Sequence, residues 1–188
     1  MENNINLKDT LVADVLALGA TKASVISVHE IKTDAAFREM CASNACGVYG
    51  KCWMCPPEIG EITELMAEIR TYDFALVYQL IGTLEDSFDF EGMQEAGDKM
   101  NTLSQELRRT CAERGLKDPL HLGAGGCRVC PVCAKRTDEP CRFPDLAMSS
   151  LEAYGINVSL LAASANMKYI NGQNTVTYFG AVFFRDET

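Results

Sequence analysis

The segment CRVCPVCAKRTDEPCRFP, residues 127–144, is the feature that most restricts how this chain can fold. Cys127, Cys130 and Cys133 are each separated by two residues, and Cys141 follows after seven more. Such a run winds a short loop around a compact object and directs three thiolates to one centre, which suits one corner of a four-iron, four-sulfur cluster. The bacterial ferredoxin run has a shorter last spacer, with proline directly after the last cysteine. The similarity therefore lies in ligand geometry and not necessarily in the fold.

Two other uses of these thiols stay open. Structural zinc usually takes its cysteines as two separate C-x2-C pairs, whereas a third cysteine at the same step is more typical of iron–sulfur ligands. Disulfides or free thiols are the remaining interpretation, which a reducing compartment disfavours. We expect one or two 4Fe-4S clusters, with zinc as the alternative cofactor.

Length and charge exclude several classes of protein. The chain has 188 residues, 47% of them hydrophobic, which is enough for one core and short for two, so we expect a single domain over residues 1–188. A net charge of −9 disfavours binding to nucleic acid and to anionic membrane surfaces. No apolar run approaches the ~20 residues of a membrane span, and the N-terminus lacks the pattern of a signal peptide. We expect a cytoplasmic protein of unspecified oligomeric state.

Eight of the nine cysteines fall into two tight groups, as metal ligands do. The first group lies in CASNACGVYGKCWMCPPEIG and consists of Cys41, Cys46, Cys52 and Cys55. Its C-x4-C-x5-C-x2-C spacing matches no common zinc ribbon, and only its first step matches the plant-type ferredoxin run. Tyr49 and Trp53 offer apolar cover for a site that excludes water. We expect a metal site that uses at least three of these thiols, with a partly free set as the alternative.

The remaining cysteine and both histidines are not expected to bind metal, and His29 should be a structural or surface residue. Cys111 lies on the apolar face of a helical pattern that ends near Gly115, so it should pack in the core. His29 falls in a predicted strand with no second histidine near it in sequence. His121 lies in a short predicted strand before the second cysteine group, and we expect it not to be a ligand.

The hydrophobic pattern predicts an α/β fold. Residues 74–81 form a continuous apolar run, which is typical of a strand covered on both faces. Two runs around Asn171 and Gly172 predict a C-terminal β-hairpin. Further strands are predicted at 23–31 and 119–122, and helices at 7–18, 37–41, 59–69, 93–111, 146–154 and 157–165. We expect a mixed sheet of four to five strands covered by helices, with both cysteine groups on connecting loops.

Three segments together resemble an uncharacterised family of small cysteine-rich predicted metal-binding proteins from anaerobic bacteria and archaea. They are Cys41 with the CGVYG and CPP motifs at 46–50 and 55–57, the cysteine run ending in Cys141-Arg-Phe-Pro144, and SLEAYGINV at 150–158. The resemblance extends from about residue 40 to the end of the chain and implies metal binding without naming a reaction. Cys52 stands where the family pattern leads us to expect a polar residue. The resemblance therefore favours Cys41, Cys46 and Cys55 as the ligands of the first group.

The fourth ligand of the Cys127–Cys133 run is predicted in two ways. Cys141 is nearest in sequence, and closing a loop of seven residues costs less entropy than closing one of about 70. Ferredoxins instead complete such a run with a remote cysteine followed by proline, which here is Cys55. In that version Cys141 would join the first group. We favour Cys141.

Three classes of function are compatible with this sequence. The first is an iron–sulfur protein that transfers electrons, either as a carrier or as a redox subunit of a partner protein. The second is a zinc-binding structural module, or one that senses redox state or metal. The third is an enzyme whose cluster has an open iron site, since no Ser/His/Asp, paired-carboxylate or phosphate-loop constellation is recognisable. The sequence names no substrate.

Overall fold

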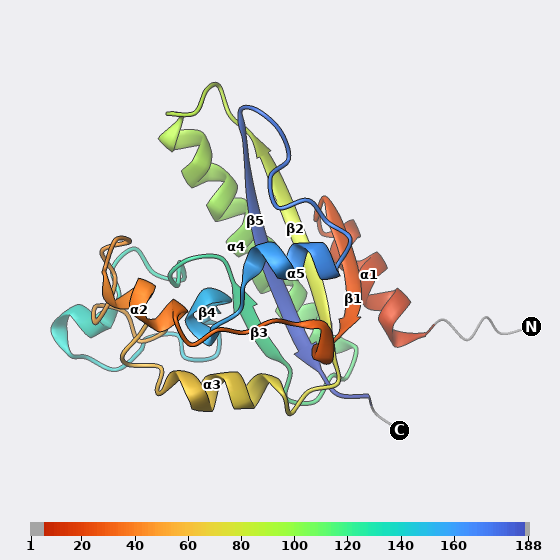
Figure 1. Ribbon diagram of the computed structural model, residues 1–188, viewed down its shortest axis with the longest axis horizontal. Helices are drawn as coiled ribbons and strands as arrows, with labels where there is room; N and C mark the ends of the chain where they lie inside the picture. The colour runs from red at the N-terminus through yellow and green to blue at the C-terminus, as the bar shows by residue number, and fades with distance from the viewer. Residues whose placement is uncertain (1–5, 187–188) are drawn as a thin grey trace, which may run out of the picture.

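The computed structural model describes residues 6–186 and contains a five-stranded mixed sheet in the order β1-β2-β5-β3-β4. Its strands are β1 (Lys22–Ser27), β2 (Phe74–Thr83), β3 (Leu120–Gly123), β4 (Ser149–Ser150) and β5 (Thr175–Phe184). In this sheet β1 and β2, β2 and β5, and β5 and β3 are antiparallel pairs, whereas β3 and β4 are parallel. The predicted mixed sheet covered by helices is confirmed (Figure 1).

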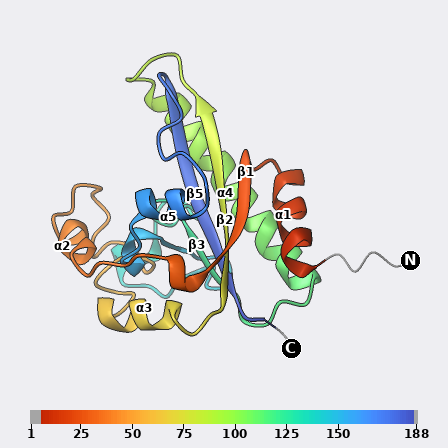
Figure 2. The ribbon, with the colours of Figure 1, turned by 45° about the vertical axis from the view of Figure 1, so that its right-hand side comes forward.

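Helices cover both faces of the sheet (Figures 1 and 2). The α-helices are α1 (Leu7–Ala17), α2 (Phe37–Ala42), α3 (Ile62–Ile69), α4 (Phe90–Glu113) and α5 (Val158–Ser164). Short 3₁₀ turns are η1 (Val28–Glu30), η2 (Ala134–Thr137) and η3 (Glu152–Tyr154). α1 and α4 pack on one face, and α3, α5 and η3 pack on the other. None of the helices within residues 6–186 has the length and apolar character needed to cross a membrane.

Successive side chains along β2 and β5 point to opposite faces of the sheet, and this divides the core into two halves. Leu76 and Tyr78 point toward α1 and α4, whereas Ala75 and Val77 point toward α3 and α5. Because both faces of β2 are covered, its sequence is apolar without alternation, as the run at 74–81 predicted. Cys111 of α4 is fully buried in the α1–α4 half of the core, which confirms its packing role.

Three helix ends that the sequence predicted are present, at Asn6, Gly115 and Asn157. Asn6 caps α1 by accepting a hydrogen bond from the Lys8 N–H, and Asn157 caps α5 through the Leu160 N–H at 3.1 Å. α4 ends before Gly115, whose φ of +79° lies in the left-handed region that glycine adopts readily.

The predicted C-terminal β-hairpin is wrong. Only β5 forms a strand, and the residues before it fold into a loop. Asn171 Nδ2 donates to the Lys168 carbonyl at 2.9 Å and to Thr177 Oγ1 at 3.0 Å, so its side chain closes this loop. The Tyr169 ring stacks on the Phe179 ring, and Tyr169 does not lie in a strand paired with β5. The chain does turn near residues 171–172. Side-chain hydrogen bonds within the loop take the place of the backbone hydrogen bonds that a first strand of the hairpin would make.

The helix predicted at 146–154 is also absent. Ser149 and Ser150 pair with Leu122 and Gly123 as β4, and only the following turn, η3, is helical. This pairing positions the site, because it places residue 150 beside the glycine-rich end of β3. Both views show α2 and the connection after β3 at the same end of the molecule (Figures 1 and 2).

Candidate metal centre

Polar contacts join the two cysteine loops, residues 43–61 and 124–148. Trp53 Nε1 donates a hydrogen bond to the Glu139 carbonyl at 2.9 Å. Lys135 Nζ lies 4.5 Å from the centroid of the Trp53 indole and 3.3 Å from Glu58 Oε1. Trp53 therefore does more than provide the predicted apolar cover, because it connects segments more than 80 positions apart.

Cys52 lies where these loops meet. Cys52 is only 4% exposed, and the side chains of Cys55 and Cys133 both act on its thiol so as to lower its pKa. The backbone N–H groups of Met54 and Cys127 donate to the same sulfur. These interactions, that with Cys55 first, lower the pKa of Cys52 to about 6 against the opposing effect of burial. The interaction with Cys52, followed by burial, raises the pKa of Cys55. The thiolate is the form that binds metals.

The thiols of the second group share one loop. Cys127 accepts hydrogen bonds from the N–H groups of Val129 and Met148, although burial dominates and raises its pKa. Burial also raises the pKa of Cys130, whose charged neighbours are the other three cysteines of this loop and Arg142. The sequence-local prediction that Cys127, Cys130, Cys133 and Cys141 lie close together is compatible with this arrangement. Bonding of any of them to a metal stays a prediction.

Three cysteines of the first group line a cavity of about 260 Å³. Cys41, Cys46 and Cys55 line one part of it, and Ser150 and Glu152 line another. The glycine-rich end of β3 comes close here, since a Cβ on Gly126 would lie 3.9 Å from the Cys55 sulfur. Apolar side chains complete the wall: Phe37, Met40, Val48, Tyr49, Pro56 and Ala153. Burial raises the pKa of Cys41, Arg38 opposes this, and Cys46 and Glu152 reinforce it.

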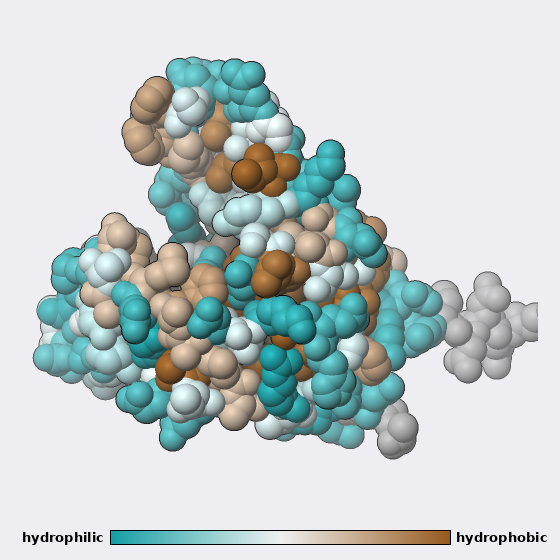
Figure 3. Space-filling view, in the orientation of Figure 1, coloured by the Kyte–Doolittle hydropathy of each residue, from teal (hydrophilic) through white to brown (hydrophobic). Residues whose placement is uncertain are grey.

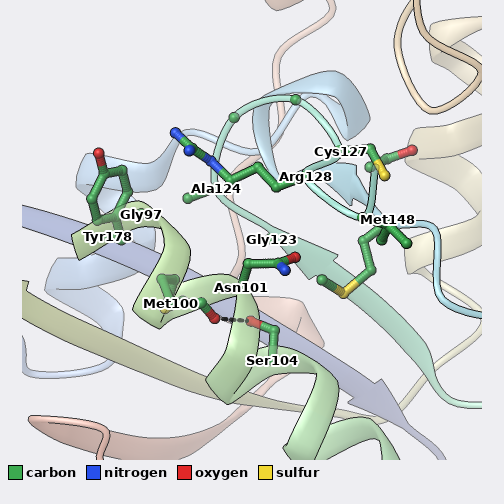
Figure 4. Close-up of a pocket in the computed structure, with 14 residues that line it drawn as sticks. Gly97, Met100, Asn101, Ser104, Gly123, Ala124, Cys127, Arg128, Met148 and Tyr178 are labelled. Carbon is green, nitrogen blue, oxygen red and sulfur yellow. Dashed lines mark hydrogen bonds between the residues drawn. The ribbon is translucent and has the colours of Figure 1, made fainter. Parts of the chain in front are cut away.

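A second, much smaller cavity separates α4 from the glycine-rich segment (Figure 4). Its volume of about 20 Å³ is sufficient for about one water molecule. Cys127 and Arg128 at its rim point to opposite sides, Cys127 toward Met148 and Arg128 toward Gly97 of α4. Arg128 lies 3.2 Å from Asp98, and a Cβ at position 97 would crowd its guanidinium. Arg128 therefore anchors the start of the second cysteine loop on α4.

Over the face in Figure 3, hydrophobic residues form separate patches divided by polar ones. The exposed apolar side chains include Met40, Phe88, Phe90, Val132 and Ile170. A single large apolar patch is the usual mark of a permanent interface, and the face shown has none.

Three residues differ from the other candidates in exposure or in hydrogen bonding: Cys46, His121 and His29. Cys46 is exposed, and each of the nine cysteines, all within the described residues, is a free thiol. His121 is 6% exposed with no hydrogen-bond partner for either ring nitrogen, and burial, aided by Arg108, lowers its pKa to about 3. It lies in β3, and its predicted non-ligand role stays a prediction. His29 is exposed in η1.

The donor set fits a thiophilic metal or an iron–sulfur cluster. Soft thiolates select zinc and iron–sulfur clusters, and hydrogen bonds from backbone N–H groups to cysteine sulfur tune such sites. Cys52 and Cys127 each accept two of these bonds. Within residues 6–186, however, no three His, Cys, Asp or Glu side chains already surround one point that could hold an ion. Binding of a metal by these thiols stays a prediction.

Sequence reasoning missed two features of this region. The contact between Cys52 and Cys133 depends on how the loops fold together, and neither spacing contained that information. The position of Glu152 beside the cavity was also missed. Glu152 belongs to the SLEAYGINV segment. This segment supported the family resemblance, but its sequence gave no chemical reason to single out Glu152.

The family described as predicted metal-binding protein (DUF2284) matches residues 24–184. The chain belongs to this family. The match contains both cysteine groups and all of the sheet except the start of β1, so the family covers the whole candidate centre. No curated protein and no solved structure matches the chain. The resemblance to a family of predicted metal-binding proteins is confirmed.

Proposed function

We propose that this protein binds one or two 4Fe-4S clusters through its grouped cysteines and transfers electrons, as a carrier or as a redox subunit of a partner protein. The observation that supports this most is the position of Cys52, which is only 4% exposed and whose pKa is lowered by Cys55 of its own group and by Cys133 of the other. Eight thiols therefore belong to one region.

The hydrogen bonds to sulfur favour iron–sulfur chemistry further. Reduction potentials of clusters depend on hydrogen bonds to the sulfurs and on solvent exposure. The Cys52 and Cys127 sulfurs accept backbone N–H groups, and Cys52 and Cys55 are buried. A bound cluster would supply one-electron chemistry. The chain would hold it through thiolates and shield it from water with Trp53 and the apolar cavity wall.

Anaerobic purification followed by iron and sulfide analysis, absorbance and electron paramagnetic resonance (EPR) tests this proposal. We expect equal amounts of iron and sulfide, and visible absorbance that bleaches on addition of dithionite. Cys130→Ser should remove most of the iron bound by the Cys127–Cys133 run, whereas Cys111→Ala is the matched control because Cys111 is buried in the core. A colourless protein that contains zinc would contradict the proposal.

A zinc-binding module that senses redox state is the second candidate, and the exposure of Cys46 favours it. Accessible thiolates react readily with oxidants and are released from zinc when they do. The same purification separates the two candidates, because a zinc protein contains no sulfide.

A further inference from the structure

We propose that the loop between β2 and α4, residues 84–91, is a docking surface for a basic partner protein. The loop presents two aromatic rings within a group of carboxylates. The partner that fits it has an apolar surface bordered by lysine and arginine side chains. None of these residues lies in either cysteine loop, so the inference goes beyond the proposed function and does not depend on metal.

Phe88 and Phe90 are unusually exposed for phenylalanine. Phe88 is 75% exposed and Phe90 is 72% exposed. Phenylalanine is among the residue types most often fully buried, and aromatic residues are enriched in protein–protein interfaces. Two exposed rings that are two positions apart therefore offer a partner an apolar anchor.

Hydrogen bonds fix the backbone that carries these rings. Asp86 Oδ1 accepts a hydrogen bond from the Phe88 N–H at 2.7 Å, and the Phe90 N–H donates to the Phe88 carbonyl at 2.8 Å. The Asp89 carboxylate accepts from the Glu85 N–H at 3.0 Å and also caps α4. The loop is thus pre-organised, so binding to it requires little additional ordering.

The loop is also joined to the segment before β5. The Leu84 N–H donates to the Asn174 carbonyl at 2.9 Å, and Asn174 Nδ2 donates to the Glu85 carbonyl at 3.1 Å. The Leu84 side chain is buried. Both views place these two connections side by side at one end of the sheet (Figures 1 and 2). The two rings are therefore carried by a segment that is supported by the fold.

The surroundings of the rings are acidic. Residues 84–97 include no lysine or arginine, and their acidic residues are Glu85, Asp86, Asp89, Glu91 and Glu95. Within residues 6–186, none of these carboxylates takes part in an ion pair. Figure 3 shows hydrophilic residues next to hydrophobic ones at this end of the molecule. An uncompensated negative charge of this kind attracts a basic partner and orients its approach.

The same charge argues against two other occupants of this surface. In a symmetric dimer through the loop, the carboxylates of both copies would face each other, and like charges across an interface are unfavourable. An anionic membrane surface would repel the carboxylates, although the aromatic rings alone would suit a membrane interface. A basic protein surface is compatible with both the rings and the carboxylates. The small apolar area suits a transient complex.

Two designed peptides test the proposal with the full chain. Both form an amphipathic helix with leucine at positions i, i+3, i+4 and i+7, and the polar face carries lysine and arginine in one peptide and glutamate in the other. Isothermal titration calorimetry at low and at physiological salt measures the affinity. We expect the basic peptide to bind more weakly as the salt concentration rises, and the acidic peptide not to bind.

Variants of the two rings locate the binding site. Phe88→Ser combined with Phe90→Ser should weaken binding of the basic peptide at least about tenfold, because burial of one such ring is worth that much. Ile170→Ser is the matched control, since Ile170 is 77% exposed but the chain has no acidic residue between Glu152 and Asp186. All three side chains are exposed, so the variants should fold, which circular dichroism verifies.

A charge variant separates the carboxylates from the rings. Glu91→Gln should weaken binding of the basic peptide about two- to fivefold at low salt and reduce its salt dependence. Glu113→Gln, at the other end of α4, is the matched control and should leave the affinity unchanged.

Each other outcome overturns the proposal. These outcomes are no binding of the basic peptide, equal affinity for both peptides, or unchanged affinity in the variant that lacks both rings. Sedimentation velocity would assign the surface to a second copy if it showed dimers that this variant loses. Flotation with phosphatidylcholine vesicles would assign it to a membrane if binding were lost in the same variant. Iron and sulfide analysis is a separate measurement, so failure of the proposed function would leave this inference standing.

Discussion

Trp53 is held between the cysteine loops by a polar contact as well as by packing. Trp53→Phe removes the hydrogen bond to the Glu139 carbonyl and weakens the contact with Lys135. A hydrogen bond of this kind contributes about 1 kcal/mol, so we expect the metal-loaded variant to fold but to release iron several-fold faster to a chelator. Stopped-flow absorbance in the presence of a ferrous chelator measures this rate. Tyr169→Phe, at an exposed ring in the loop before β5, is the control, and equal release rates for both variants would refute the role of Trp53.

His121 makes stability depend on pH. Burial lowers its pKa in the folded chain to about 3, below the unfolded value of about 6.5. Above pH 6.5 the ring is neutral in both states and contributes no pH dependence. As the pH falls from 6.5 toward 3, only the unfolded chain takes up the proton, and the folded state loses about 2 kcal/mol by pH 5.

Replacing the ring should remove that loss. For His121→Leu we expect the free energy of unfolding to fall less between pH 7 and pH 5 than for the unmodified chain, as urea denaturation would measure. The matched control is His29→Leu, at the exposed histidine of η1. The same pH response in both variants would show that His121 is not the responsible group.

Among the elements, β2 and β5 pack too closely at one point to admit an extra methyl group. Gly180 of β5 is paired with Tyr78, and a Cβ there would overlap the tyrosine ring. The ring cannot easily move, because it is fully buried and its hydroxyl is 2.8 Å from Ser104 Oγ of α4. We expect Gly180→Ala to cost about 1–3 kcal/mol in thermal or urea unfolding.

Gly123→Ala in β3 is the matched control for this substitution. A Cβ there would meet only the flexible end of Met148, at 3.7 Å. If both variants were equally stable, the tight approach of β5 to Tyr78 would not constrain the sheet.

The elements that could be predicted from sequence are those whose signal is local and repeated. The run at 74–81 and the helix ending before Gly115 were recognisable because burial on both faces, or on one helical face, sets a pattern over many residues. The hairpin failed because side-chain bonds of Asn171 closed a loop. The helix at 146–154 failed because two serines joined the sheet beside β3.

In the candidate site, too, local features could be predicted from the sequence and contacts between distant segments could not. Spacing predicted both cysteine groups to be metal ligands, since thiols on one short loop are close whatever the fold. The contact of Cys52 with Cys133 crosses between groups and depends on the packing of two loops against each other. The resemblance counted Cys52 as a departure from the family pattern, whereas the structure places it at the centre of the thiol-rich region.

At the level of the whole molecule, the core and the cysteine region are built from different residues. Both halves of the core consist of side chains from the sheet and the helices, and none of the eight grouped cysteines belongs to either half. Zinc fingers, in contrast, depend on the metal for folding and are unfolded without it. The sheet of this protein should therefore persist when its metal is removed.

Metal removal should loosen the loops alone. After treatment with a strong chelator, we expect the far-ultraviolet circular dichroism to change little, because β2, β5 and α4 keep their packing. Trypsin should then cut first after Lys51, Lys135 and Arg142, which lie in the two cysteine loops, and these cuts should slow when iron and sulfide are restored. Mass spectrometry of the early fragments locates the cuts. Early cuts within the sheet, or a shift of the dichroism to that of an unfolded chain, would mean that the metal maintains the core as well as the loops.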